Sequence, residues 1–403
     1  MKGNWKEFNL GKLGKSYSGL SGKTKDDFGF GRPYIPYLRI FEDGKIDTSR
    51  LDLVNVEKNE KQNTVKYGDL FFTTSSETIE EVGMTSVLLE EPKENIYLNS
   101  FCFGFRLHNF EDVLPDYARY LFRGEEIRKK ISVIGQGSTR YNLPKTILFE
   151  KLYLNVPNPL HQQKIAKILN TIDAVIDKTE QAIAKYQALK KGMMHDLFTR
   201  GIDLKTGKLR PNYEEAPELY KESKLGMIPK DWSVEPLSKL GVIKSGIDYK
   251  SNPKGNKFPI YGTGGIMGWT SLYLNSGPAV LTGRKGTINN PLFVEDKFWN
   301  VDTIFCINSI NTKETDIKWL FYQFRNTDLT KLNEATGVPS VNSSALYKLL
   351  FKTPLFKEQE EIQFRITKID TLIEKEKENL KKHQKIKKGL MQDLLTGKVE
   401  VKV

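Results

Sequence analysis

Two stretches of the chain carry apolar residues at alternating intervals of four and three positions, the pattern of a coiled-coil seam. Over residues 157–200 the seam positions are Ile165, Leu169, Ile172, Ile176, Thr179, Ile183 and Tyr186. Over residues 357–403 they are Ile362, Ile366, Ile369, Ile373, Glu376, Leu380 and His383. Each stretch predicts one long helix, and about 38 helical residues at ~1.5 Å each make a rod of roughly 55–60 Å.

A helix of this length gains stability mainly by packing its apolar stripe against a partner. The simplest partner for each predicted helix is the other one, arranged antiparallel with one segment of the chain at each end. The interface of this pair is expected to contain Ile165, Ile172, Ile176, Ile183, Ile362, Ile369, Ile373 and Leu380. Thr179 and Glu376 interrupt the seams at the same level, and this polar layer either fixes the register or lies on a solvated edge. Gly201 is expected to end the first helix.

The two stretches are copies of each other. Residues 157–199 align with residues 354–396 at a constant offset and without a gap. The shared positions include Gln162/Gln359, Asp173/Asp370, Lys190/Lys387, Lys191/Lys388 and Gly192/Gly389. Shorter matches precede them, at Trp5, Gly14 and Gly19 and again at Trp232, Gly241 and Gly246. The order segment, helix, segment, helix is an internal repeat, for which a partner with two-fold symmetry is natural.

The segments between the helices, residues 1–156 and 231–356, predict mixed α/β domains. Short runs of β-branched and aromatic residues, such as 69–73 and 100–106, predict strands. A helix is expected to start at Asp116 and to run to about Ile131. Runs at 277–282, 302–307 and 316–322 repeat this order in the second segment, with little identity. Because the connector over residues 201–230 is rich in Pro, Gly and mixed charges, it is expected to lie along the surface.

The net charge of +12 permits a nucleic-acid partner, although the excess is spread thinly along the 403 residues. The local pattern is more informative, because four Gly/Ser/Asn-rich loops carry basic residues and no acid. These loops span residues 15–25, 134–145, 249–257 and 282–290. Ordinary solvated loops are the alternative for any one of them, but two in each half favour basic patches.

The sequence offers little support for catalytic chemistry. Cys102 and Cys306 lie in apolar runs and are expected to be buried, inert thiols, and the four histidines lack metal-ligand spacing. The run at 19–24 resembles a phosphate-binding loop, but Tyr17 occupies the place of its first glycine. The run at 28–31 resembles a methyl-donor glycine motif, yet no Asn-Pro-Pro-aromatic tetrapeptide follows, so a turn is expected. No run of eighteen apolar residues is present, and the chain is expected to be cytoplasmic.

These features together resemble the DNA-specificity subunit of type I restriction–modification systems. The resemblance covers the whole chain and rests on three duplicated motifs. They are Pro-x-x-x-x-Gln-x-x-Ile at 157–165 and 354–362, Ile-Asp-x-x-Ile at 172–176 and 369–373, and Lys-Lys-Gly-x-Met-x-Asp-Leu at 190–197 and 387–394. Glu358-Gln359 matches the usual Glu-Gln start of the helical region, whereas the first copy departs from it with His161-Gln162.

The resemblance implies two mixed α/β target-recognition domains, separated by two long antiparallel coiled-coil helices in a pseudo-two-fold repeat. The implied division is residues 1–156 and 231–356 for recognition, 157–200 and 357–403 for the helices, and 201–230 for the connector. It also implies a non-catalytic reader of a bipartite duplex DNA target, without a metal or cofactor of its own. Two methyltransferase subunits, which bind S-adenosylmethionine, and a restriction and translocation subunit are the implied partners.

Candidate DNA contacts follow from loop position and side-chain chemistry. Arginine suits guanine and asparagine suits adenine, whereas lysines suit phosphates. Base edges are assigned to Arg140, Tyr141, Asn142, Arg284, Lys285, Asn289 and Asn342. Phosphates are assigned to Lys23, Lys25, Lys250, Lys254 and Lys257.

Three alternatives stay open at this point. The chain can be the reader of a bifunctional restriction–methylation enzyme of a related system. It can be a scaffold that spaces two protein-interaction domains without DNA, or a fused nuclease or methyltransferase. The acid-free loops disfavour the scaffold, and the missing motifs disfavour the enzyme.

Overall fold

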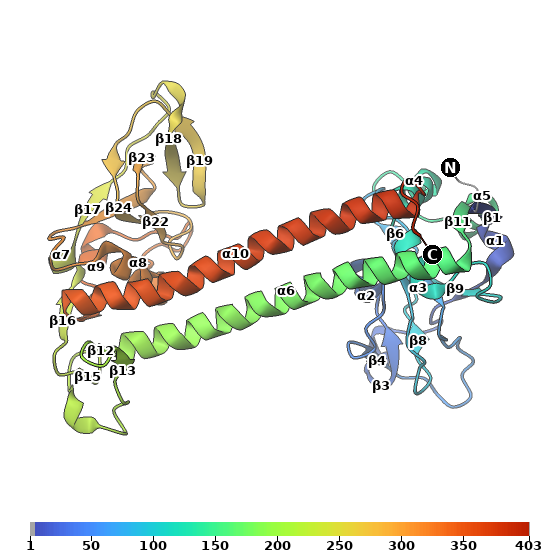
Figure 1. The fold of residues 1–403 in the computed structure, drawn as a ribbon, viewed down its shortest axis with the longest axis horizontal. Helices are drawn as coiled ribbons and strands as arrows, with labels where there is room; N and C mark the ends of the chain where they lie inside the picture. The colour runs from blue at the N-terminus through green and yellow to red at the C-terminus, as the bar shows by residue number, and fades with distance from the viewer. Residues whose placement is uncertain (1–4, 403) are drawn as a thin grey trace. The chain divides into compact units, whose positions relative to one another are not determined.

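A computed structural model describes residues 5–402 of the chain. The chain divides into two compact units, which we call unit 1 (residues 1–180 and 378–403) and unit 2 (residues 181–377). Each unit therefore combines one α/β segment with parts of both long helices (Figure 1). The boundaries between the two compact units fall near the middle of α6 and of α10. They therefore do not test the five-part division expected from the sequence, which stays a prediction.

The two long helices are α6 (Pro159–Thr199) and α10 (Phe356–Leu395), as the apolar periodicity predicted. In unit 1, Ile165 and Leu169 near the start of α6 share a core with Leu394 and Leu395 at the end of α10. The helices are therefore antiparallel there. In unit 2, the end of α6 shares a core with the start of α10, through Met194, Leu197, Ile362 and Ile366. The expected Gly201 stop is also present, since this residue follows α6 with a φ of 66°.

Burial along the helix seam is uneven. Ile165, Ile362 and Ile373 are buried. The middle positions are half-buried, namely Ile172, Ile176, Ile183, Ile369 and Leu380. Ile165 and Ile362 lie in the cores that the helices share with the α/β domains, and this second covering surface explains their burial, whereas Ile373 is buried although it lies in neither core. Thr179 is buried, and its hydroxyl donates to the Val175 carbonyl of the same helix at 2.7 Å.

Unit 1 is built on a four-stranded antiparallel sheet of order β2–β9–β5–β7. Its strands are β2 (Gly14–Ser18), β9 (Cys102–Leu107), β5 (Leu70–Thr73) and β7 (Thr85–Val87). The central strand β5 is buried along its whole length, which explains its continuous apolar run. A smaller sheet has the order β4–β3–β8, formed by β4 (Asp52–Val54), β3 (Phe28–Ile35) and β8 (Tyr97–Leu98).

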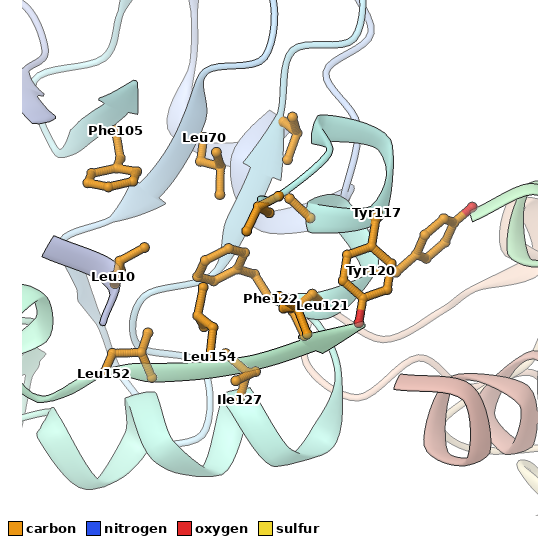
Figure 2. Close-up of a cluster of buried hydrophobic side chains, with 14 of the residues drawn as sticks. Leu10, Leu70, Phe105, Tyr117, Tyr120, Leu121, Phe122, Ile127, Leu152 and Leu154 are labelled. Carbon is orange, nitrogen blue, oxygen red and sulfur yellow. The ribbon is translucent and has the colours of Figure 1, made fainter. Parts of the chain in front are cut away.

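The core of unit 1 joins the sheet to both long helices. Figure 2 shows part of it, with Leu70 and Phe105 from the sheet and Phe122 and Ile127 from the covering helices. Strand β1 (Trp5–Asn9) pairs antiparallel with β11 (Tyr153–Pro157), which leads into α6. The remaining elements are α1 (Leu10–Leu13), η1 (Lys25–Asp27), α2 (Tyr37–Glu42), β6 (Ser75–Ser76), α3 (Pro115–Leu121), α4 (Glu125–Ile134), β10 (Tyr141–Asn142) and α5 (Lys145–Lys151).

Unit 2 repeats the sheet order of unit 1 with different loops. Its four-stranded sheet is β17–β24–β21–β22, with β17 (Gly241–Ser245), β24 (Ile304–Ser309), β21 (Ala279–Gly283) and β22 (Leu292–Val294). Its second sheet is β19–β18–β23–β20, with β18 (Lys254–Gly262), β19 (Gly265–Thr270), β20 (Asn275–Ser276) and β23 (Lys297–Asn300). In both units the second sheet contains one parallel pair, β3–β8 and β18–β23. Strand β16 (Ser233–Pro236) pairs with β25 (Leu350–Thr353), as β1 pairs with β11. The helices are α7 (Leu237–Leu240), α8 (Ile317–Asn326), η3 (Leu329–Leu332) and α9 (Ser343–Tyr347).

The helix expected from Asp116 to Ile131 is interrupted, which corrects that prediction. It is divided into α3 and α4 by Gly124, whose backbone is extended. A Cβ at Gly124 would lie 3.1 Å from the Leu395 side chain, so the break lets α10 approach closely. Arg123 occupies the same break and donates to backbone carbonyls, including that of Thr85 at 2.8 Å.

The connector does not lie along the surface throughout, which corrects a second prediction. It forms two hairpins, β12 (Ile202–Asp203) with β13 (Lys208–Leu209) and β14 (Tyr220–Lys221) with β15 (Ile228–Pro229), around η2 (Pro217–Leu219). Ile202 and Ile228 lie in the core of unit 2. Among residues 5–402, none of the helices combines the length and the apolar composition of a membrane span.

Candidate DNA interface

In unit 2 the end of β21 meets a loop from much later in the chain. The Val341 amide donates to the Arg284 carbonyl at 2.9 Å, and the Gly286 amide donates to the Pro339 carbonyl at 2.8 Å. Lys285 forms an antiparallel bridge with Ser340. These backbone bonds place Arg284 and Lys285 on an exposed platform formed by residues 284–286 and 337–342, which we call the strand-end platform of unit 2.

Unit 1 contains an equivalent strand-end platform, formed by residues 74–76 and 136–143. Strand β6, which follows β5, pairs with β10, and the Leu143 amide donates to the Thr74 carbonyl at 2.8 Å. Arg140 is exposed and lines a cleft with Tyr37, Ser75 and the carboxylates of Glu77 and Glu81. The platform therefore offers hydrogen-bond donors from Arg140 and acceptors from the carboxylates of Glu77 and Glu81. Such a combination can discriminate among base edges.

A second group of candidates lies in and around the β4–β3–β8 sheet of unit 1 and the β19–β18–β23–β20 sheet of unit 2. Lys25, Lys250, Lys254 and Lys257 are all exposed. The Lys257 ammonium lies 5.2 Å from the centre of the Phe258 ring, so the lysine stem covers apolar surface while the charge stays accessible. Lys254 and Lys257 lie on β18, and in Figure 1 the β18–β19 hairpin stands away from α8 and α9 of the same unit.

The structure leaves some predicted contact residues engaged within their own domain. The Lys23 side chain is 7% exposed, and its ammonium lies 2.5 Å from Glu60. Hydrogen bonds from Lys23 and, to a smaller extent, from Gln62 lower the pKa of the Glu60 carboxyl to about 2. Asn342 caps α9 by accepting from the Ala345 amide at 2.7 Å, and its own amide group donates to Glu334.

Two further candidates are partly engaged. The Asn289 side chain accepts from the Leu329 amide at 2.9 Å, which leaves its NH₂ group as the available donor. The Tyr141 ring packs partly against the core of unit 1, whereas Asn142 is exposed. All contact assignments stay predictions, but Lys23 and Asn342 are the least suited of the set, because binding DNA would first break the contacts described above.

An exposed apolar surface covers β19 and the following loop. The sequence-based choice of candidates did not include it, because that choice started from the basic loops. About half of each side chain is exposed in Ile266, Met267, Trp269, Leu272 and Tyr273. The Lys297 ammonium lies 4.5 Å from the centre of the Tyr273 ring. Large apolar side chains interleaved with lysines suit the sugars and base faces of nucleic acid. The sequence signal was the strand-like run at 265–270, which has apolar residues on both faces.

Neither cysteine is placed to act as a nucleophile. Cys102 and Cys306 are buried, as expected from their apolar runs, and both are free thiols. Burial raises the pKa of the Cys306 thiol to about 11 and raises that of Cys102 further. The glycine motif at 28–31 lies within strand β3, where Gly29 and Gly31 take positive φ at a bulge. Across the described residues no cluster of His, Cys, Asp and Glu is suited to hold a metal ion.

Comparisons with known proteins agree with this duplicated architecture. A family model for the type I restriction modification DNA specificity domain matches residues 2–187 and again residues 229–383. The MjaVIII specificity subunit of Methanocaldococcus jannaschii is 29% identical over 285 residues, which are 63% of this chain and 64% of that subunit. The putative MjaX specificity subunit of the same organism is 26% identical over 417 residues, 96% of this chain and 91% of that subunit.

Solved structures show the same fold at low identity. The S subunit of a type I restriction–modification system from M. genitalium has a TM-score of 0.61 at 15% identity, covering 97% of this chain and 96% of that one. A second solved chain comes from a structural study of complex assembly and conformational transition in the type I R-M system. Its TM-score is 0.55 at 14% identity, and the match covers 98% of this chain and 99% of that one. The family model covers most of the sequence, in two regions that correspond to the two α/β domains with adjoining helix. The chain therefore belongs to the type I restriction–modification DNA specificity family, as a DNA-recognition subunit with two specificity regions.

Proposed function

We propose that this chain is the non-catalytic reader of a type I restriction–modification complex, with one half of a split DNA target read by each α/β domain. The observation that carries the proposal is the repeated sheet order, β2–β9–β5–β7 and β17–β24–β21–β22, with different loops on each copy. Equal scaffolds with unequal loops are suited to two versions of one recognition task, since binding residues concentrate on loops held by a rigid framework.

The long helices are proposed to set the distance between the two half-sites. Half-sites one turn of DNA apart, about 34 Å, lie on the same face of the duplex. Helices α6 and α10, with 41 and 40 residues, each begin in one unit and end in the other. A change in helix length is therefore expected to change the spacer, whereas a change in the loops is expected to change the half-sites.

Contact roles are proposed from accessibility and chemistry. Arg140, Asn142, Arg284 and Lys285 on the two strand-end platforms are proposed to read base edges, because arginine can bond guanine with two donors and asparagine can bond adenine. The exposed lysines are proposed to contact phosphates; they are Lys25, Lys250, Lys254 and Lys257. Met267 and Trp269 are proposed to add apolar contact beside these lysines.

The proposed partners are duplex DNA, two methyltransferase subunits and a restriction and translocation subunit. S-adenosylmethionine is proposed to be bound by the methyltransferases, and this chain is proposed to contribute recognition alone. The internal repeat supports two equivalent partner subunits, because a pseudo-two-fold chain presents similar helical surfaces twice.

Motif-resolved mapping of adenine methylation in plasmid DNA tests the proposal. The chain is co-expressed with its neighbouring methyltransferase, first unchanged and then with residues 1–156 replaced by another first recognition domain. Methylation at a split motif is expected, and the replacement is expected to change only one half of it. A chain lacking residues 231–356 serves as the control that cannot read the second half.

Two outcomes would contradict the proposal. If an active methyltransferase modifies no split motif, the two-reader assignment fails. If the replacement changes nothing, or changes both halves, recognition does not divide between the domains. Methyl transfer by the isolated chain would show that it carries catalytic chemistry, and absence of salt-dependent DNA binding would favour a protein scaffold.

A further inference from the structure

In unit 1, three elements meet at the carboxylate of Asp173 on α6. The Tyr120 hydroxyl of α3 donates to its Oδ2 atom at 2.6 Å, and the Arg119 Nη2 atom donates to the same oxygen at 2.5 Å. The Lys387 ammonium of α10 lies 2.6 Å from the Oδ1 atom. A single carboxylate therefore links the recognition domain to both long helices.

In unit 2, an equivalent junction forms around Asp370 on α10. The Tyr322 hydroxyl of α8 donates to its Oδ2 atom at 2.9 Å, and the Lys190 ammonium of α6 lies 2.5 Å from its Oδ1 atom. Lys190 also lies 5.4 Å from the centre of the Tyr322 ring. The recognition domain and both long helices again meet at one aspartate.

The residues of the two junctions are the same positions of the internal repeat. Asp173 and Asp370 are equivalent, as are Lys190 and Lys387, and each lysine bonds the aspartate of the opposite copy. This crossed pairing gives a physical reason for these identities between the two copies. The second lysine of each repeated pair, Lys191 or Lys388, is exposed.

The junctions fix an orientation of the domain and the two helices that the apolar seam alone does not fix. Apolar packing is non-directional, so the seam alone restrains sliding or rotation of the helices only weakly. Hydrogen bonds to a charged group are short and depend on angle, so donors from two elements on a carboxylate of a third fix the mutual orientation of all three. Burial raises the pKa of the Tyr120 and Tyr322 hydroxyls above the ordinary tyrosine value, so both act as donors at neutral pH.

We propose that Asp173 and Asp370, each with its tyrosine and the crossed lysine, are positioning residues that fix the orientation of a recognition domain on the helix pair and thereby the spacer length that the subunit accepts. This inference rests on the proposed function. The junctions differ in one respect. The residue before the tyrosine is Arg119 in unit 1 but Phe321, which has no charge, in unit 2. Loss of the lysine is therefore expected to matter more at Asp370 than at Asp173.

The test compares Lys190→Met with Lys191→Met, and Lys387→Met with Lys388→Met, because each pair removes one charge from neighbouring positions on the same helix. Each variant is co-expressed with the methyltransferase, and methylation is measured on a plasmid library that holds the half-sites constant and varies the spacer by one or two base pairs. Lys190→Met is expected to lower the preference for the correct spacer about tenfold, since a charge-assisted hydrogen bond is lost. Lys387→Met is expected to lower it less, and both control variants are expected to keep the wild-type preference.

Tyr322→Phe removes one donor with little change in shape and provides a second variant if Lys190→Met does not fold. It is expected to relax the spacer preference while the half-site bases stay unchanged. The inference is overturned if folded Lys190→Met and Tyr322→Phe reduce methylation equally at every spacer, which is the result of a merely stabilising contact. Failure of the wild-type subunit to direct methylation to any split motif would instead contradict the proposed function.

Discussion

The carboxylate of Glu358, at the start of α10, is fully buried, and removing it is expected to destabilise unit 2 in a measurable way. Its Oε1 atom accepts from the Ile202 amide at 2.6 Å and from Arg210 at 2.5 Å. Its Oε2 atom accepts from Arg210 and from the Trp232 indole, both at 3.0 Å. Glu358→Ala would leave all of these donors without their acceptor.

The magnitude follows from the partners that remain. Breaking a buried ion pair by removing one member costs about 3–5 kcal/mol. Arg210 keeps a contact to Asp231 at 2.7 Å, so we expect a loss of about 3 kcal/mol in the free energy of unfolding. For a domain of roughly 150–250 residues this corresponds to about 6–12 °C in Tm. Glu358→Gln keeps one acceptor oxygen and the side-chain shape, so about half of this loss is expected.

Urea unfolding measures the loss, and hydrogen exchange followed by mass spectrometry locates it. Peptides that cover residues 201–232 are expected to lose protection, whereas peptides from β5 and β9 in unit 1 are expected to change little. Glu361→Ala is the matched control, because Glu361 forms a partly exposed pair with Arg365 one turn along the same helix. A loss below about 1 kcal/mol for Glu358→Ala, or one equal to that of Glu361→Ala, would refute the assigned role.

Three further predictions concern a turn, the phosphate contacts and the thiols. Gly201→Ala is expected to cost more than about 2 kcal/mol in urea unfolding, because φ is positive and the new Cβ would lie 2.2 Å from Glu358. Gly207→Ala has a similar φ and open space, and a comparable loss there would disprove the steric argument. Lys254→Ala is expected to reduce the slope of log affinity for duplex DNA against log salt by about 0.9, and an unchanged slope would exclude a phosphate contact. Cys102 and Cys306 are expected to resist a thiol reagent at pH 8 until the protein is denatured, since burial raises the pKa of both; labelling of the folded protein would contradict this.

The long helices were predictable because the intervals of four and three continue over many turns, so local interruptions did not hide the period. The break at Gly124 was not predictable in the same way. Apolar positions continue across it, and the space that it leaves is filled by Leu395 from the far end of the chain, which no local pattern reveals. The core role of the connector was hidden for a similar reason, since Ile202 and Ile228 are isolated apolar residues among turn formers.

The candidate site was predictable as a set of loops but not as individual contacts. Arg140 and Arg284 are exposed where the acid-free loops suggested, and backbone pairing with distant segments holds both on platforms. Lys23 looked equally suitable in the sequence, but its partner Glu60 lies in a different loop. A count of charges also overlooks apolar contact surface, so Trp269 escaped notice.

The division of the long helices between the units has a consequence for how the protein is made. Unit 2 is one continuous run of chain, whereas unit 1 needs residues 378–403 to complete its core with Leu394 and Leu395. Domains usually form in the order in which the ribosome delivers them. Here the first α/β domain is synthesised first, but its core is completed last. Completion requires the closure of a loop of roughly 200 residues, which costs about 4–5 kcal/mol in chain entropy. Loss of the last helical turns would therefore harm the domain made earliest and spare the one made just before them.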